Sequence, residues 1–362
     1  MTTRVAGEAY PNLLKEKGGT GFPTLLILDV EGNILARQGE RTVAAFETTL
    51  KAVLDLRALE QKAKAGDTSG TADIVLAKLT LGSIKKLDEA KAALAAAGKL
   101  APEQRKRADG LLLALEMNEL ATEARKPGSG IDLGARCAEW FTAGKIPSGD
   151  ATMFYTSIMT HAERTKDPQL FERAFAGYKA MRGNDERFKV FYATSESRLA
   201  RLVRFAELTK KAKSGDSQAE FDLLLLRIEM GEVTADEAKA AIAAAKVGEA
   251  EKKAAEPWLL GFEVRDMLEA AHTPAEREAV QKRLAEMFVA GKVPKTQSQV
   301  FFMNVLMHAE RSKDTDLLAK AIAAARERVA TDPVLSSLVA RYEAQLKKAT
   351  GGDKNGEPGK RK

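Results

Sequence analysis

Residues 141–147 have the sequence Phe-Thr-Ala-Gly-Lys-Ile-Pro, and residues 288–294 repeat it as Phe-Val-Ala-Gly-Lys-Val-Pro. The two copies lie 147 positions apart. Three more pairs of similar segments keep a spacing of 147 to 149 positions: 59–67 with 208–216, 89–93 with 237–241, and 159–167 with 306–314. Because so many matches share one spacing, the sequence indicates an internal duplication.

Short breaks rich in Gly, Pro and Asp divide both halves into segments of about 12 to 25 residues, which predict helices. Helices joined by short links pack as antiparallel pairs and stack into a solenoid. Ala-rich stretches at 90–97 and 238–245 permit the close helix approach that such stacking needs. The architecture resembles tetratricopeptide-like arrays, although their Trp-Leu-Gly-Tyr signature at a period of about 34 residues is missing. The resemblance therefore implies helical-hairpin repeats and no more.

The composition fits a mainly α protein, because 44% of the residues are hydrophobic, 30% are charged and only 6% are aromatic. We predict four parts: a partial α/β unit at 1–57, two helical halves at 58–205 and 206–348, and a disordered basic tail at 349–362. The net charge of +6 comes from 57 basic and 51 acidic residues. Since basic and acidic residues alternate along the helices, we do not expect a nucleic-acid surface, which would cluster basic residues among aromatic ones.

A β-hairpin is predicted before the helices. Residues 25–28, Leu-Leu-Ile-Leu, form an apolar run too short for a buried helix, and a second short apolar segment follows at 34–36. The residues between them, Asp-Val-Glu-Gly-Asn at 29–33, favour a turn. Two apolar runs around such a turn indicate a hairpin. A helix is then expected from about residue 42, with no breaker before Gly66.

This region resembles the second half of a thioredoxin domain. In that family an aromatic or β-branched residue, a cis-proline and a threonine precede a core strand, and an Asp-x-x-Gly turn leads to the last strand and a terminal helix. Phe22, Pro23 and Thr24 match the first element, and Asp29 and Gly32 match the turn. The family binds extended peptides at the backbone beside the cis-proline. The resemblance thus implies that Phe22, Pro23 and Thr24 contact a protein or peptide partner.

The Cys-x-x-Cys pair of thioredoxins is missing, since the one cysteine, Cys137, lies far along the chain. A dithiol cycle needs two thiols within disulfide reach, so we expect this chain alone to be redox-inactive. Without the strand that leads to the cysteines, residues 24–28 would form an open apolar edge. Two explanations stay open at this point. Either a partner supplies the strand, or the chain is the C-terminal portion of a thiol-disulfide oxidoreductase whose true start lies upstream.

His161 and His308 occupy equivalent positions in two copies of His-Ala-Glu-Arg. A metal or acid–base site would pair each histidine with Glu163 or Glu310. Residues i and i+2 of a helix point about 200° apart, which opposes that pairing. We therefore expect both histidines to act structurally near helix C-termini.

Cys137 corresponds to Leu284 in the second half, so we expect it to behave as a small hydrophobic residue. The glycine-rich residues 18–21 lack the Lys-Ser/Thr that follows in a phosphate-binding loop. The sequence thus predicts no catalytic residue, no metal and no cofactor.

Function and location follow from these observations as expectations. No stretch approaches the about 18 apolar residues that span a bilayer, and residues 1–17 lack the features of a signal peptide. Cytoplasm is the default expectation, with an exported or periplasmic location if the start is truncated. We predict a non-enzymatic interaction protein whose helical solenoid binds a protein partner. The alternative is the thioredoxin-family oxidoreductase described above.

Overall fold

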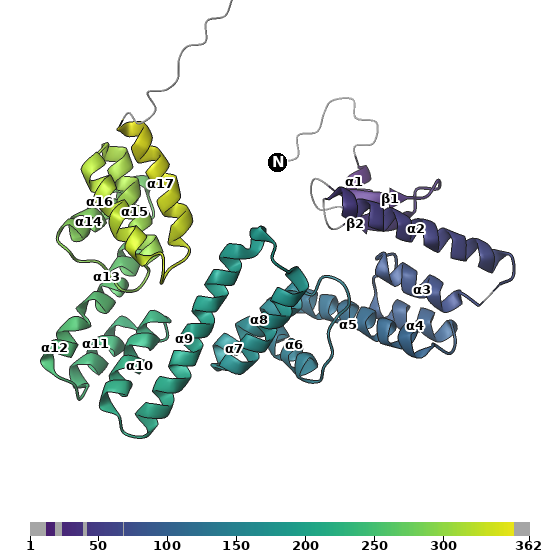
Figure 1. Ribbon diagram of the computed structural model, residues 1–362, viewed down its shortest axis with the longest axis horizontal. Helices are drawn as coiled ribbons and strands as arrows, with labels where there is room; N and C mark the ends of the chain where they lie inside the picture. The colour runs from purple at the N-terminus through teal and green to yellow at the C-terminus, as the bar shows by residue number, and fades with distance from the viewer. Residues whose placement is uncertain (1–11, 19–23, 39–41, 68, 351–362) are drawn as a thin grey trace, which may run out of the picture. The chain divides into compact units, whose positions relative to one another are not determined.

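The computed structural model describes residues 12–18, 24–38, 42–67 and 69–350 (Figure 1). These residues form helices and a small antiparallel hairpin near the N-terminus, which confirms the predicted mainly α fold. The chain forms two compact units, one up to residue 161 and one from residue 162, and the division falls within helix α7 (Thr152–Thr165). None of the helices in the described ranges is long and apolar enough to cross a bilayer.

The hairpin pairs β1 (Leu25–Leu28) with β2 (Ile34–Gln38), as the two apolar runs predict. Asp29 closes the turn, because its carboxylate accepts hydrogen bonds from the backbone N–H (2.7 Å) and the Nδ2 (3.0 Å) of Asn33. The side-chain bond from Asn33 holds the pKa of Asp29 below its usual value. Gly32 adopts a φ of 82°, which L side chains rarely adopt. The turn residues therefore fix the hairpin.

The described residues show no thioredoxin sheet, since their one sheet consists of β1 and β2. Phe22 and Pro23 lie outside the described residues, so their predicted contact with a partner stays a prediction. Thr24 directly precedes β1. Two strands are too few to make an independently stable sheet, so the hairpin depends on the helix packed against it.

Helix α2 (Val43–Lys64) supplies that support. It begins where the Thr42 side chain accepts a hydrogen bond from the N–H of Ala45 (3.2 Å), and it runs without interruption past residue 57. Val53 and Leu56 are buried in one core with Ala36 of β2. The predicted boundary between residues 57 and 58 therefore falls inside a single helix.

The remaining elements of the first unit are α1 (Leu13–Glu16), α3 (Thr71–Thr80), α4 (Leu87–Ala96), α5 (Pro102–Ala124) and α6 (Leu133–Thr142). The second unit contains α8 (Pro168–Arg182), the 3₁₀ helix η1 (Glu186–Phe188), α9 (Lys189–Lys213), α10 (Ser217–Glu229), α11 (Ala235–Ala244), α12 (Glu249–Ala254), α13 (Glu256–Ala270), α14 (Pro274–Val289), α15 (Ser298–Ser312), α16 (Thr315–Arg328) and α17 (Leu335–Ala349). The predicted boundary between residues 205 and 206 falls inside α9. The glycines that follow α2, α3, α4, α6, α8, α9, α10 and α14 all have positive φ, as expected where glycine-containing breaks end helices.

Backbone conformations and helix caps recur at the spacing of the sequence repeats. Lys166 and Lys313, 147 positions apart, both lie in the left-handed region, with φ of 59° and 57°. The next residues, Asp167 and Asp314, cap α8 and α16 in the same way. Each side chain accepts a hydrogen bond of 2.9 Å from the backbone N–H three residues later.

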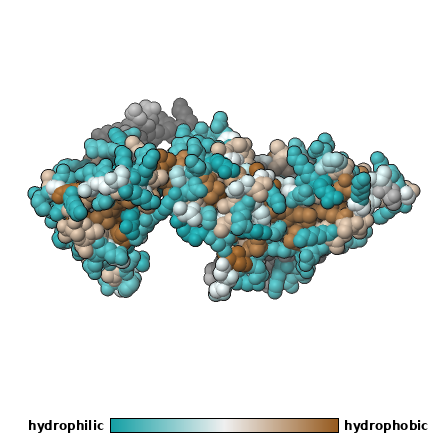
Figure 2. Space-filling view, turned by 90° about the horizontal axis from the view of Figure 1, so that it is seen from below, coloured by the Kyte–Doolittle hydropathy of each residue, from teal (hydrophilic) through white to brown (hydrophobic). Residues whose placement is uncertain are grey.

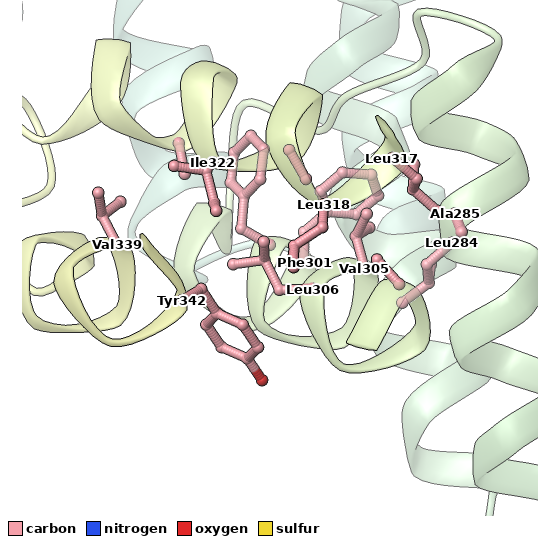
Figure 3. Close-up of a cluster of buried hydrophobic side chains, with 14 of the residues drawn as sticks. Leu284, Ala285, Phe301, Val305, Leu306, Leu317, Leu318, Ile322, Val339 and Tyr342 are labelled. Atoms are coloured by element: carbon pink, nitrogen blue, oxygen red, sulfur yellow. The ribbon is translucent and has the colours of Figure 1, made fainter. Parts of the chain in front are cut away.

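Helices α14 to α17 share a large hydrophobic core in the second unit, where side chains from all four helices meet (Figure 3). Phe301, Val305 and Leu306 of α15 are fully buried among Leu318 of α16 and Tyr342 of α17. Burying one apolar side chain of this size contributes about 1.5 to 3 kcal/mol. This cluster is therefore a main source of stability in the second unit.

Replacing Gly134 by alanine should destabilise the first unit. A Cβ atom on Gly134 of α6 would lie 2.8 Å from the Ser157 carbonyl oxygen and 2.8 Å from the Cβ of His161. Since a backbone oxygen of α7 cannot rotate away, the helices must separate, at a cost of about 1 to 3 kcal/mol. Chemical denaturation followed by circular dichroism measures the loss. The matched control is Gly248→Ala, whose new Cβ would meet only the flexible Glu251 carboxylate. Equal midpoints for the two variants would contradict the close contact of α6 and α7.

Candidate functional site

In the first unit, a groove of about 1010 Å³ is formed by α4, α5, α6 and the loop that follows α6. Its apolar lining includes Leu112 and Leu113 of α5, Trp140 of α6 and Ile146 of the loop. Ile146 is 47% exposed. Apolar residues reach the surface in patches among hydrophilic ones, as the space-filling view illustrates (Figure 2). We call this site the first groove.

Charged side chains surround the apolar lining of the first groove. Lys91 of α4 and Lys145 of the loop are exposed, and neither ammonium group is bonded to another residue in the described part of the chain. Asp109 and Glu116 of α5 add two carboxylates. The Glu116 carboxylate lies 3.8 Å from the Arg136 guanidinium. The two lysines are therefore available to carboxylate or carbonyl oxygens of a ligand.

In the second unit, a groove of about 870 Å³ is formed by α11, α13 and the loop that follows α14. Leu259 and Leu260 of α13 and Val293 of the loop give it an apolar lining. Lys239 of α11 and Lys292 of the loop stand beside it, and both are exposed. Their ammonium groups, too, are unbonded to any other residue that the structure describes. We call this site the second groove.

The two grooves are built from equivalent positions. Ten residues of the first groove have a counterpart 147 or 148 positions later that lines the second. The pairs are Leu87 and Ala235, Lys91 and Lys239, Asp109 and Glu256, Gly110 and Pro257, Leu112 and Leu259, Leu113 and Leu260, Glu116 and Glu263, Gly144 and Gly291, Lys145 and Lys292, and Ile146 and Val293.

The loop lysines are presented by the same backbone geometry. Gly144 and Gly291 both have a φ of 73° and turn the chain at the ends of α6 and α14. The N–H groups of Lys145 and Lys292 each donate a hydrogen bond of 2.8 Å back into the preceding helix. These bonds are typical of a helix C-terminus closed by glycine. The position of each lysine is therefore fixed at its backbone, while its side chain is exposed to solvent.

Each loop is also tied to the helix that forms the groove floor. The Ser148 N–H donates a hydrogen bond of 2.9 Å to the Gly110 carbonyl of α5. The Lys295 N–H donates one of 2.9 Å to the Pro257 carbonyl of α13. Donor and acceptor of the second bond each lie 147 positions after those of the first. The loop and the floor therefore meet in the same register in both units.

The histidines predicted as structural residues lie outside both grooves. His161 of α7 has its Nδ1 3.6 Å from the Asp132 carboxylate, which also caps α6. Glu163, the acidic neighbour considered for a metal or acid–base pair, accepts hydrogen bonds from Arg198. His308 is partly buried on α15. Across residues 12–18, 24–38, 42–67 and 69–350, no cluster of His, Cys, Asp and Glu is placed to hold a metal ion.

Cys137 should be unreactive in the folded chain. Its side chain is fully buried, as is Leu284 at the equivalent position, and burial raises the pKa of the thiol to about 12. Only the thiolate attacks disulfides, so insulin reduction by dithiothreitol should proceed at the same rate with and without this chain. A thiol reagent should label Cys137 only after the chain is unfolded. Turnover above background, or rapid labelling of the native chain, would contradict this expectation.

The sequence interpretation did not identify the grooves. Their four lysines nevertheless lie in the repeated segments, at 89–93 with 237–241 and at 141–147 with 288–294. The sequence therefore marked the groove lysines as repeated residues, without showing that they line a groove. Nothing in the spacing alone shows that the two repeated segments of one half line a common groove.

No protein-family model, curated protein or solved structure matches this chain. The chemistry and geometry of the two grooves are therefore the basis for assigning a function to this chain.

Proposed function

We propose that this chain is a protein-interaction module made of a duplicated array of helical hairpins, in which each half presents one peptide-binding groove. The observation that carries the proposal is the equivalence of ten lining positions in the two grooves. Folding alone does not account for the shared lysines. They are exposed, and their ammonium groups form no ion pair or hydrogen bond with another described residue.

Core positions differ between the two halves, whereas the groove lysines do not. Fully buried positions have changed between them, with Cys137 in place of Leu284 and Ile158 in place of Val305. The lysines at the groove edges are identical in both halves. Identity at an exposed edge, where core positions have diverged, is better explained by binding than by packing.

The chemistry of the grooves favours a short peptide segment with one apolar anchor. The leucine pair on the floor can bury an apolar side chain, and the volumes of about 870 and 1010 Å³ suit a short segment. The lysine ammonium groups can donate to carbonyl or carboxylate oxygens, and Glu116 or Glu263 can accept a backbone N–H. These features are those of peptide recognition by a helical groove.

Selection of peptides from a displayed random library on the immobilised full chain tests the proposal. Selected peptides should share one central Leu, Ile, Phe or Met. Their binding should change the fluorescence of Trp140, which lines the first groove, in a Trp258→Phe variant that keeps Trp140 as its one tryptophan. No enrichment, or bound peptides that leave this fluorescence unchanged and do not compete with one another, would refute it.

Exposed apolar residues near the N-terminus favour a second function. Leu25 and Leu28 of β1 are large apolar residues on the surface. Four more exposed apolar residues lie on one side of α2, because their spacing of three and four positions repeats with the helix: Val43, Phe46, Leu50 and Leu54. We propose as the alternative that β1 and this side of α2 receive the first half of a thioredoxin-like domain, with a strand pairing to β1 and a cysteine pair supplying thiol–disulfide exchange. With dithiothreitol as the reductant, a thioredoxin fragment that carries these elements should then bind the chain and accelerate insulin reduction only in its presence. Absence of a complex removes this alternative.

A further inference from the structure

The two grooves differ in the charges that are not repeated. Arg105, Lys106 and Arg107 of α5 line the first groove, and no lining residue of the second groove corresponds to them. The first groove is lined by five basic and three acidic residues, and the second by two basic and three acidic residues. The two grooves therefore share ten equivalent lining positions but differ in the charge of the residues around them.

A helix break and a change of residue type accompany this difference, since the counterparts of residues 105–107 are Lys252, Lys253 and Ala254. Helix α5 runs continuously through Gly110, so its basic turn at residues 105–107 stands on the same helix as the leucine floor. The second half has Pro257 at the equivalent position, and α12 ends before α13 begins at Glu256. Proline lacks an N–H and clashes with the preceding helical turn, which breaks the helix. Lys252, the counterpart of Arg105, instead donates a hydrogen bond of 3.1 Å to the Ala243 carbonyl.

Side chains next to the grooves also affect the difference in charge between them. In the first groove, Glu116 is compensated by Arg136 at 3.8 Å, whereas none of the five basic groups pairs with a carboxylate among the described residues. In the second groove, Asp266 is compensated by Arg265 at 3.1 Å. The first groove therefore carries a net positive charge, and the second is close to neutral.

We infer that the two grooves select different peptides: the first binds an acidic segment of a protein partner with one apolar anchor, and the second binds an apolar anchor with little regard to flanking charge. This inference depends on the proposed function. Charge complementarity favours an acidic peptide at the first groove. A nucleic acid is disfavoured there, because the leucine floor offers nothing to a phosphate backbone and the carboxylates of Glu103 and Asp109 repel it.

Two synthetic peptide pools test the inference on the full chain. Both pools carry one central leucine, flanked in one by Asp and Glu and in the other by Asn and Gln. Trp140 fluorescence in the Trp258→Phe background reports binding at the first groove. We expect the acidic pool to bind about three- to tenfold more tightly at about 50 mM salt, and the preference to disappear at about 500 mM salt, where exposed charges are screened.

The double variant Arg105→Gln/Lys106→Gln should abolish the preference, because both side chains are exposed and line only the first groove. The matched control is Lys210→Gln/Lys211→Gln on α9, which removes the same charge from residues that line neither groove. Equal affinities for the two pools, or an unchanged preference in the double variant, would overturn the inference and leave the proposed function standing. Binding of neither pool would overturn both. If a single-stranded oligonucleotide displaces the acidic pool at a lower concentration than the unlabelled acidic pool itself requires, the inference would be overturned in favour of nucleic-acid binding.

Discussion

Replacing Phe301 by alanine should lower the free energy of unfolding of the second unit by about 3 to 5 kcal/mol. Phe301 is fully buried in the core of α14 to α17. Its ring meets that of Phe302 edge-to-face, with centroids 5.6 Å apart. The substitution removes a large apolar side chain and leaves a cavity that the surrounding helices keep from closing. Guanidinium denaturation followed by circular dichroism measures the loss.

Two matched variants make this prediction specific. Met303→Ala changes the same helix at a side chain that is 37% exposed, and it should cost less than about 1 kcal/mol. Phe154→Ala changes the equivalent position of the first unit, where the ring is also fully buried, and it should cost as much as Phe301→Ala. A small loss of unfolding free energy for Phe301→Ala, or an equal loss for Met303→Ala, would contradict the burial of Phe301 in this core.

Placing a carboxylate in either groove should weaken peptide binding there by at least about tenfold. Ile146→Asp changes the first groove and Val293→Asp changes the second. Each removes apolar contact area, at about 25 cal/mol per Å², and forces the bound peptide to desolvate a charge. Isothermal titration with a library-selected peptide should show that each variant loses one class of sites and keeps the other.

Nearby exposed residues provide the controls for the groove variants. Val289→Asp changes the last residue of α14, at a side chain that is 74% exposed and lines neither groove. Ile131→Asp, at a side chain that is 37% exposed and lines neither groove, is the control in the first unit. Both should bind like the unmodified chain. Equal weakening by groove and control variants would show that added charge acts at a distance, and that the grooves are not the binding sites.

The sequence predicted the features of this fold that depend on local residues. Gly66, Gly144 and Gly291 end helices because they adopt positive φ, a preference visible in the residue type itself. The hairpin was predicted by two apolar runs around the turn at Asp29 and Gly32. The burial of Cys137 was expected because its counterpart is leucine.

Features that depend on contacts between distant segments were not predicted. The first groove brings Lys91 of α4 together with Lys145, which lies far along the chain, and only the packing of α4, α5 and α6 places both on one groove. The predicted boundary at 205 fell inside α9, because a helix can continue from one packing unit into the next. The continuous helix across residue 57, in contrast, was expected from the absence of a breaker before Gly66. A short motif of hairpin and helix resembles a thioredoxin domain locally, but it does not specify the strands that would complete the sheet.

The number of peptide sites on the chain tests the central claim most directly. Isothermal titration of the full chain with a selected peptide should give two sites per chain, and the Ile146→Asp and Val293→Asp variants should give one each. A single site on the unmodified chain, or two sites that persist in both variants, would contradict the presence of one peptide-binding groove in each half.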